Sequence, residues 1–302
     1  MDLRFEPLDA PLGAQVLGFD PSASAEPIDA TAVAALGQAL VDHSVLVFRG
    51  AAISPADLVA LGRAFGQLEI LPEPEKRHPD HPEIFNLTNV RPDGDVVERD
   101  EPQAVFLRGT ERWHTDSSFR AVPSLCTMLY AVEVPDSGGE TEFADMYRAF
   151  DELPGDLRVE VTDRRLIHSY AYSRANNPGE LEPMSDEELA QFPPVSHPLV
   201  RQHPDGRCSL YLGGHVAAMD GVDDPEGRER IDAVLAHATQ ERFVYQHRWQ
   251  ANDLVVWDNR STLHRLRPYD IAGTPRVMRR ITVAGNDAPV PASGPVPAPA
   301  ST

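Results

Sequence analysis

The sequence predicts a mainly β fold with flanking α-helices, arranged as a β-sandwich or jelly roll. Runs rich in β-branched and aromatic residues recur between turns of Gly, Pro and Asp. They are too frequent and too separated for a doubly wound parallel sheet, and the first helical patterns come early, where helices can pack outside the sheets. The strand-like runs are residues 126–134, 207–214, 242–249, 253–258 and 277–285.

Helices are predicted from apolar spacing and from capping residues. Residues 31–42 place Leu36 and Leu40 on one helical face, and a β-branched run at 44–50 follows. Ser, Asp or Pro at a helix start satisfies or avoids the free amide donors of the first turn. Further helix starts are predicted at Ser54, Asp145, Ser185 and Pro225.

Composition limits the possible partners. The chain has 302 residues, 41% of them hydrophobic, which is enough for a large core. Its formal charge of −20 repels phosphate backbones and anionic lipid, so we expect no nucleic-acid and no membrane partner.

Cys126 and Cys208 are far apart and form no CxxC motif, so we interpret them as reduced core cysteines. The acidic, proline-containing start does not resemble a signal peptide, and we expect a cytoplasmic protein.

The last residues differ in composition from the rest. Residues 287–302 are mostly Pro, Ala and Ser, a composition that cannot compensate for the entropy of ordering, and we predict a disordered tail. Before the tail there is no long break in composition and no repeat. We therefore predict a single domain over residues 1–286.

A His-x-Asp/Glu triplet in a strand places both side chains on one face, because the residue period is two. Such short motifs are common by chance, and the sequence contains four. Three have a central proline, which indicates solvated loops. The fourth, His114-Thr115-Asp116, lies between Trp113 and Phe119, in an aromatic setting that can shape a dry site. The three proline triplets begin at His78, His81 and His203.

A third ligand is available at His264, just after the apolar run 253–258. Two imidazoles and one carboxylate form the facial triad of non-haem Fe(II) oxygenases, which leaves coordination positions open. A purely structural role for His264 is the alternative. Zinc-dependent hydrolysis by the same three residues and a non-enzymatic jelly-roll binding protein are more remote alternatives.

Arginines are concentrated in residues 260–280, which contain six arginines and only one acidic residue. Arg276 and Arg280 are four apart in a predicted strand and should share one face. Burying two guanidinium groups is costly unless carboxylates meet them, which predicts a dicarboxylate cosubstrate and an anionic substrate. A solvated strand with surface arginines is the alternative.

Four motifs carry a resemblance to a known family: WHTDSSF, SGGETEF, WDNRSTLH and RVMRR. Together they resemble the taurine dioxygenase family of Fe(II)/2-oxoglutarate-dependent dioxygenases. The segments SVLVFRG, LTNVRPDG and ATQERFVYQHRW make the 2,4-dichlorophenoxyacetate, or aryloxyalkanoate, branch the closest, over about residues 40–285. The resemblance implies a double-stranded β-helix (jelly-roll) core, with Fe(II) as cofactor and with 2-oxoglutarate and O2 as cosubstrates.

The resemblance also implies a role for each residue that matches a motif position. His114, Asp116 and His264 would hold the iron, Thr141 and Arg276 would bind the distal carboxylate of 2-oxoglutarate, and Arg280 would hold the substrate's anionic group. Trp113 and Trp257 would pack around the ligands.

The implied reaction hydroxylates a small anionic organic substrate and releases succinate and CO2. An aryloxyalkanoate cleaved at its ether link is the first expectation, and an alkylsulfonate, an alkyl sulfate or an N-acyl amino acid are the alternatives. Residues 71–111 and 172–196 would shape the substrate pocket. Lys76 is a candidate for substrate binding, with a solvated loop lysine as the alternative, and His215 is interpreted as structural. Relatives of this kind predict a homo-oligomer.

Overall fold

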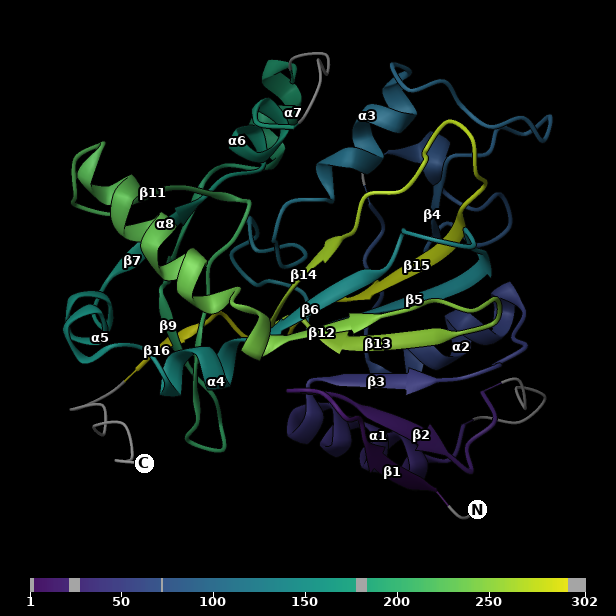
Figure 1. Cartoon of the computed structure of the whole chain (residues 1–302), viewed down its shortest axis with the longest axis horizontal. Helices are drawn as coiled ribbons and strands as arrows, with labels where there is room; N and C mark the ends of the chain where they lie inside the picture. Colours follow the sequence, from purple (N-terminus) through teal and green to yellow (C-terminus); the bar gives the residue numbers. More distant parts are fainter. Residues whose placement is uncertain (1–2, 22–27, 72, 178–183, 293–302) are drawn as a thin grey trace.

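The computed structural model describes residues 3–21, 28–71, 73–177 and 184–292. Within them, a seven-stranded sheet and a three-stranded sheet face each other and form the predicted jelly roll, with two further three-stranded sheets beside it (Figure 1). The described residues include no helix that is both long and apolar enough to span a membrane.

The large sheet supplies one wall of the jelly roll. Its neighbouring strands are antiparallel except for β2 and β3, which are parallel. The predicted runs at 126–134, 253–258 and 277–285 become β5, β13 and β15 with ends shifted by one or two residues. In spatial order the strands are β1 (Arg4–Pro7), β2 (Ala14–Leu17), β3 (Val45–Phe48), β13 (Leu254–Asp258), β5 (Cys126–Glu133), β15 (Val277–Val283) and β4 (Phe85–Thr88).

The small sheet supplies the opposite wall. Its order is β12 (Val244–His247), β6 (Thr141–Asp145) and β14 (Thr262–Leu266). The predicted run 242–249 is only partly a strand, because it begins in the short helix η2 (Glu241–Phe243). Phe143 of β6 packs 5.3 Å, ring to ring, from Trp257 of β13, so apolar side chains fill the space between the walls.

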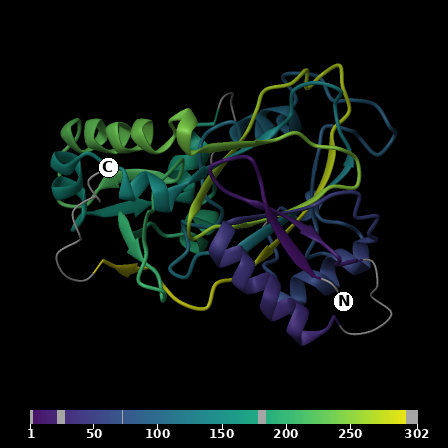
Figure 2. The ribbon, with the colours of Figure 1, turned by 60° about the horizontal axis from the view of Figure 1, so that its bottom comes forward.

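Two early helices cover the outer face of the large sheet. They are α1 (Ala30–His43) and α2 (Pro55–Phe65), and their apolar faces share a core with β3, β5, β13 and β15. Ser54 and Asp57 form the expected reciprocal cap of α2. In Figure 2, α1 (purple) and α8 (green) lie on opposite sides of the ribbon.

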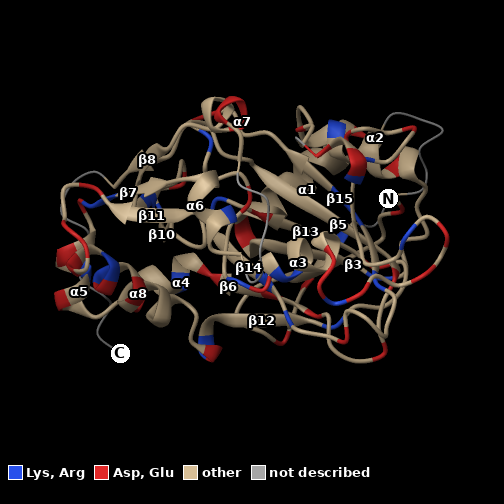
Figure 3. Cartoon of the chain, turned by 90° about the horizontal axis from the view of Figure 1, so that it is seen from above, with Lys and Arg blue, Asp and Glu red and all other residues tan. Residues whose placement is uncertain are grey.

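A second lobe contains two sheets and three further α-helices. Its sheets have the orders β11-β7-β8 and β10-β9-β16, and α4, α5 and α8 pack on their apolar core. Acidic side chains mark α5 and α7 at the periphery (Figure 3). The bounds are β7 (Arg165–His168), β8 (Val195–Pro198), β9 (Val200–Gln202), β10 (Cys208–Leu210), β11 (Val216–Met219), β16 (Val290–Pro291), α4 (Met146–Asp151), α5 (Gly155–Val161) and α8 (Glu226–Ala238).

Four further helical segments lie around the open end of the jelly roll. They are η1 (Pro74–Lys76), α3 (Pro102–Gly109), α6 (Tyr170–Ala175) and α7 (Asp186–Gln191). The helix starts predicted at Asp145, Ser185 and Pro225 are found at α4, α7 and α8.

The predicted tail needs a correction at its beginning. Val290 and Pro291 form β16 against β9, and the amide of Ala292 donates to the carbonyl of Val200. Backbone pairing with β9 offsets the ordering entropy that composition alone left uncompensated. The prediction of disorder from residue 287 is therefore wrong for this stretch, and residues 293–302 lie outside the described residues.

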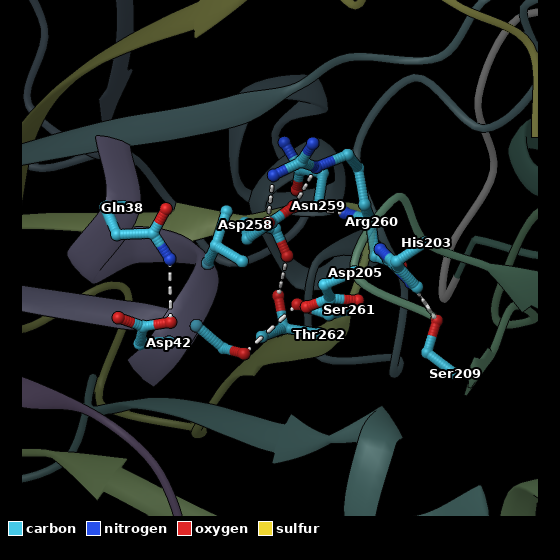
Figure 4. Close-up of polar contacts among 12 residues, drawn as sticks. Gln38, Asp42, His203, Asp205, Ser209, Asp258, Asn259, Arg260, Ser261 and Thr262 are labelled. Carbon is cyan, nitrogen blue, oxygen red and sulfur yellow. Dashed lines mark hydrogen bonds and ion pairs between the residues drawn. The ribbon is translucent and has the colours of Figure 1, made fainter. Parts of the chain in front are cut away.

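A tight turn connects β13 of the large sheet with β14 of the small sheet. Arg260 binds both carboxylate oxygens of Asp258, at 2.8 and 2.6 Å, and Thr262 Oγ1 donates to the Asp258 carbonyl at 2.7 Å (Figure 4). These bonds fix the turn from both sides and set the register of β14.

Candidate active site

His114, Asp116 and His264 come together between the two walls. The first two lie in the loop before β5, and His264 lies in β14. The His114 amide donates to the His264 carbonyl at 3.0 Å, and the His264 amide donates back at 2.8 Å. This bridge sets the two rings 4.2 Å apart, and one potential ligand atom from each of the three residues lies within 4.8 Å of the others.

The glycine at 213 permits this arrangement. Its φ of +129° is a conformation that side-chain-bearing residues rarely adopt. A Cβ there would meet the His114 Cα at 3.1 Å and the Trp113 carbonyl at 3.2 Å. Only a residue without a side chain lets this backbone lie so close to the ligand loop.

The protonation states suit a metal ion. His114 Nδ1 donates to the Arg112 carbonyl at 2.7 Å, which leaves Nε2 free to bind. Burial lowers the pKa of both His114 and His264, so both rings are neutral. Burial would raise the pKa of Asp116, but the Arg280 guanidinium and the hydrogen bond from Thr127 hold it well below its usual range.

Two neutral imidazoles and one ionised carboxylate are the ligand set of non-haem Fe(II) sites. The Nδ1 atom of His264 has no hydrogen-bond partner in the described residues, and its Nε2 faces Asp116 Oδ2 at 3.7 Å. The three residues therefore fit an Fe(II) ion.

A chain of hydrogen bonds orients the Asp116 carboxylate. Thr127 Oγ1 donates to Asp116 Oδ2 at 2.7 Å and accepts from Asn259 Nδ2 at 2.8 Å. Asn259 in turn accepts from Trp257 Nε1 at 2.9 Å. Sequence reasoning missed Thr127 and Asn259, because only the pairing of β5 with β13 places them beside Asp116.

Replacing Thr127 with Val should weaken metal binding by about 10-fold, because partners that orient metal ligands contribute on the order of 10- to 100-fold in affinity. Titration of Mn(II) into the protein measures this. The matched control is Thr282→Val, a buried threonine that pairs with Thr127 across β5 and β15 and whose hydroxyl has no partner in the described residues. Equal losses in the two variants would contradict the orienting role.

A cavity beside the cluster contains Arg276. Its lining includes His114, His264, Thr141 and Arg280. Arg276 is only 4% exposed, and its Nε has no hydrogen-bond partner within the described part of the chain. Burial lowers the pKa of Arg276 to about 10. A buried guanidinium without a carboxylate is costly, so the cavity suits a ligand that carries one.

Asn89 holds Arg276 in place. Its Oδ1 accepts from the Arg276 amide at 2.6 Å, and its Nδ2 donates to the carbonyls of Ile271 and Thr274. Gly139, with a φ of +71°, lies against the Arg276 side chain, where a Cβ would approach the Arg276 Cδ and Nε at 3.4 Å. Sequence reasoning did not identify Asn89, although it lies in the segment LTNVRPDG.

The hydroxyl of Thr141 is also oriented by a neighbour. Trp249 Nε1 donates to Thr141 Oγ1 at 3.0 Å. Because this oxygen already accepts a hydrogen bond, its own proton is available for a carboxylate in the cavity. Trp249 is a further residue that sequence reasoning missed.

The basic segment 260–280 is less available to anions than its composition predicts. Arg265 and Arg267 form ion pairs with Glu142 of β6, and Arg260 pairs with Asp258. Acids from neighbouring strands thus neutralise these arginines, which a count along the sequence does not reveal.

The predicted common face of Arg276 and Arg280 is found, since both line the same cavity. This holds although the pairing of β15 with β5 shifts register between Val277 and Met278. Arg280 also reaches Asp116, with Nη1 at 3.3 Å from Oδ1.

A second pocket opens on the other side of the cluster. It is lined by His114, Asp116 and Arg280 at its inner end and by aromatic side chains on its walls. As the resemblance implies, residues from 71–111 and 172–196 contribute to the lining. The aromatic side chains are Phe85, Phe106, Phe119 and Tyr170.

His215 also lines this pocket. Burial lowers its pKa to about 3, so the ring is neutral, and its Nδ1 lies 3.3 Å from Ser118 Oγ.

Lys76 lines a neighbouring hollow instead of the pocket, with its ammonium 3.3 Å from the centre of the Phe106 ring. Its side chain is only 20% exposed, so the alternative of a solvated loop lysine is wrong.

A jelly roll that places a buried His-Asp-His cluster beside a buried, unpaired arginine defines a non-haem, 2-oxoglutarate-type oxygenase. Residues 4–282 match the family described as "Taurine catabolism dioxygenase TauD, TfdA family", and the chain belongs to this family. It is an Fe(II)- and 2-oxoglutarate-dependent dioxygenase that uses O2.

Known relatives are similar over most of the chain. An alpha-ketoglutarate-dependent 2,4-dichlorophenoxyacetate dioxygenase of Cupriavidus pinatubonensis is 41% identical over 85% of this chain and 90% of its own. An (S)-phenoxypropionate/alpha-ketoglutarate-dioxygenase of Sphingobium herbicidovorans is 33% identical over 93% and 95%. The crystal structure of AAD-2 with Mn(II) and N-oxalylglycine superposes with a TM-score of 0.85 and 37% identity, over 96% of this chain and 99% of that chain.

Proposed function

We propose that the enzyme hydroxylates aryloxyalkanoates at the carbon next to the ether oxygen and so cleaves the ether. The observation that carries the proposal is the aromatic-walled pocket with Arg280 at its inner end, beside Asp116. An aryloxyalkanoate has the matching parts, an aryl ring and a carboxylate a few atoms away. The similarity to dioxygenases named for 2,4-dichlorophenoxyacetate and phenoxypropionate supports the same choice.

In this proposal the two cavities have separate tasks. His114, Asp116 and His264 hold Fe(II), and Arg276 with Thr141 binds the distal carboxylate of 2-oxoglutarate in the inner cavity. Bound Fe(II) with 2-oxoglutarate and O2 supplies the oxidation, in which one oxygen atom enters succinate, the other enters the substrate as a hydroxyl group, and CO2 is released. Arg280 orients the substrate carboxylate, so the carbon that lies nearest the cluster is the one attacked.

The product of that hydroxylation is a hemiacetal. It has a hydroxyl and an aryloxy group on one carbon, and it collapses to a carbonyl compound and a phenol. In this step the protein positions the substrate, because Arg280 holds its carboxylate and the aromatic walls hold its ring.

A substrate panel tests the proposal. Succinate formation should rise most with phenoxyacetate and 2,4-dichlorophenoxyacetate, and the corresponding phenol should be released. A higher kcat/KM for an alkylsulfonate, an alkyl sulfate or an N-acyl amino acid would contradict the aryloxyalkanoate assignment.

Replacing Arg280 with Ala should raise KM for the aryloxyalkanoate by on the order of 10- to 100-fold, the size expected for one charge-assisted hydrogen bond. KM for 2-oxoglutarate should change much less. The matched control is Arg279→Ala, the adjacent arginine of β15, which does not line either cavity. An equal loss for substrate and cosubstrate would contradict the division of tasks between Arg280 and Arg276.

Three expectations from the sequence remain proposals. One is a single dioxygenase domain over residues 1–286, another is a cytoplasmic location, and the third is a homo-oligomer. Sedimentation analysis of the purified protein tests the oligomeric state, and a monomer at micromolar concentration would contradict it.

A further inference from the structure

A second hollow adjoins the aromatic-walled pocket at its outer end. It is lined by Lys76, by residues of β4 and by the start of α3. Only three residues border both spaces, among those that the structure describes: Glu73, Phe106 and Arg174. These three residues therefore lie at the boundary between the pocket and the hollow.

Phe106 is the apolar part of this partition. It extends from α3, which lies beside β4 and above β15 in Figure 1, and its ring is 6.1 Å from that of Phe85. Phe106 is only partly buried, and it lines both the pocket and the hollow. Lys76 holds its ammonium 3.3 Å from the ring centre, a cation–π contact that fixes the ring from the outer side.

These groups form a row that leads away from the metal ligands. Arg280 contacts Asp116 and lies 5.1 Å from the Phe85 ring, Phe85 neighbours Phe106, and Phe106 carries Lys76. A carboxylate held by Arg280 would therefore point its aryl ring along Phe85 towards Phe106. The far end of that ring would meet the partition.

Two polar groups brace the same boundary. Tyr170 Oη, from α6, donates to Glu73 Oε1 at 2.8 Å, which ties the segment before η1 to α6. Lys76 lies 3.8 Å from the Glu75 carboxylate, and burial lowers the pKa of Lys76. A hydrogen bond and a cation–π contact thus help to hold the partition, to which Arg174 also belongs, and removing the Phe106 ring would open its apolar part.

Resting on the proposed function, we infer that the hollow is an outer subsite for the distal part of an elongated aryloxyalkanoate. Phe106, held by Lys76, sets the length of substrate that the enzyme accepts. Single-ring substrates fit inside the partition. A second ring or a long para substituent has to displace Phe106 to reach the outer subsite.

The test compares phenoxyacetate with 4-phenoxyphenoxyacetate, which adds a second ring at the para position. The measured quantity is the ratio of their kcat/KM values, from succinate formation by the Fe(II)-loaded enzyme. Phe106→Ala should raise the ratio, two-ring over one-ring, by about 10-fold or more, the size by which pocket shape discriminates related apolar groups. Lys76→Met should raise the ratio in the same direction by a smaller factor.

Phe119→Ala is the matched control, because Phe119 lines the pocket but not the hollow. It should leave the ratio unchanged or lower it. Phe106→Leu, which keeps most of the volume, guards against a folding defect in Phe106→Ala and should give an intermediate ratio.

Two outcomes would overturn the inference in different ways. A wild-type enzyme that turns over phenoxyacetate, with a ratio that rises no more in Phe106→Ala than in Phe119→Ala, overturns the outer subsite alone. A wild-type enzyme that forms no succinate with phenoxyacetate overturns the proposed function, and the inference with it.

Discussion

Replacing Asp116 with Ala should abolish succinate formation, with a loss of at least about 1,000-fold, since a group acting in one catalytic unit contributes on that order. Asp116 is the only carboxylate in the His-Asp-His cluster of the described residues, and its ionised form is stabilised by Arg280 and by Thr127. Without it, two neutral imidazoles remain beside an unpaired guanidinium, an environment that repels a cation. Mn(II) binding should be lost together with activity.

The fold should survive this substitution. The backbone bridge between His114 and His264 does not involve the Asp116 side chain, and Ser124 Oγ bonds the Asp116 carbonyl, which alanine keeps. Circular dichroism and thermal unfolding check this. The control is Asp205→Ala, from a proline-containing triplet, whose carboxylate instead pairs with Arg207. Retained decarboxylation of 2-oxoglutarate in Asp116→Ala would contradict the metal assignment.

Replacing Arg276 with Met should remove 2-oxoglutarate binding without destabilising the ligand-free protein. The guanidinium is buried without a carboxylate partner in the described residues, and replacing it with an apolar side chain removes the cost of keeping an unpaired charge out of water. A ligand that binds only the folded state raises the unfolding temperature. That increase should be lost in the variant.

Thermal unfolding of the Mn(II)-loaded protein, with and without N-oxalylglycine, measures both effects at once. Wild type and the control Arg279→Met should be stabilised by the ligand, and Arg276→Met should not. An Arg276→Met protein that is strongly destabilised without ligand would mean that the arginine has an internal partner. A variant that keeps its full ligand-induced increase would contradict the role in 2-oxoglutarate binding.

Spacing along the sequence was sufficient to predict several residues of the site and one helix cap. The His-x-Asp spacing in an aromatic setting singled out His114 with Asp116, although the two lie in the loop before β5 and not in a strand as expected. The period of two put Arg276, just before β15, and Arg280 on one side, where they line the same cavity. Proline in the other His-x-acid triplets set them apart from the His-Asp-His cluster, which contains none of their residues in the described part of the chain. The expectation of solvated loops is wrong for His203, which is buried and bonded to Ser209 Oγ. The reciprocal cap at Ser54 was also visible from spacing alone.

The other site residues could not be predicted, because their neighbours are set by contacts between distant strands and loops. Asn89 and Trp249 orient site residues that are distant in the sequence, and no spacing rule connects a side chain to a partner more than a hundred positions away. Glu142 neutralises two arginines of the basic segment because β6 pairs with β14. Lys76, predicted as a substrate ligand or a solvated residue, is not solvated, and no spacing in the sequence indicates its contact with the ring of Phe106.

The stoichiometry of a single reaction tests the central claim most directly. The Fe(II)-loaded wild-type enzyme, supplied with 2-oxoglutarate, O2 and phenoxyacetate, should form succinate and phenol in equal amounts, because one turnover oxidises both molecules. Omitting phenoxyacetate should leave only slow succinate formation. Phenol released without succinate would contradict the account, and so would succinate formation that phenoxyacetate does not increase.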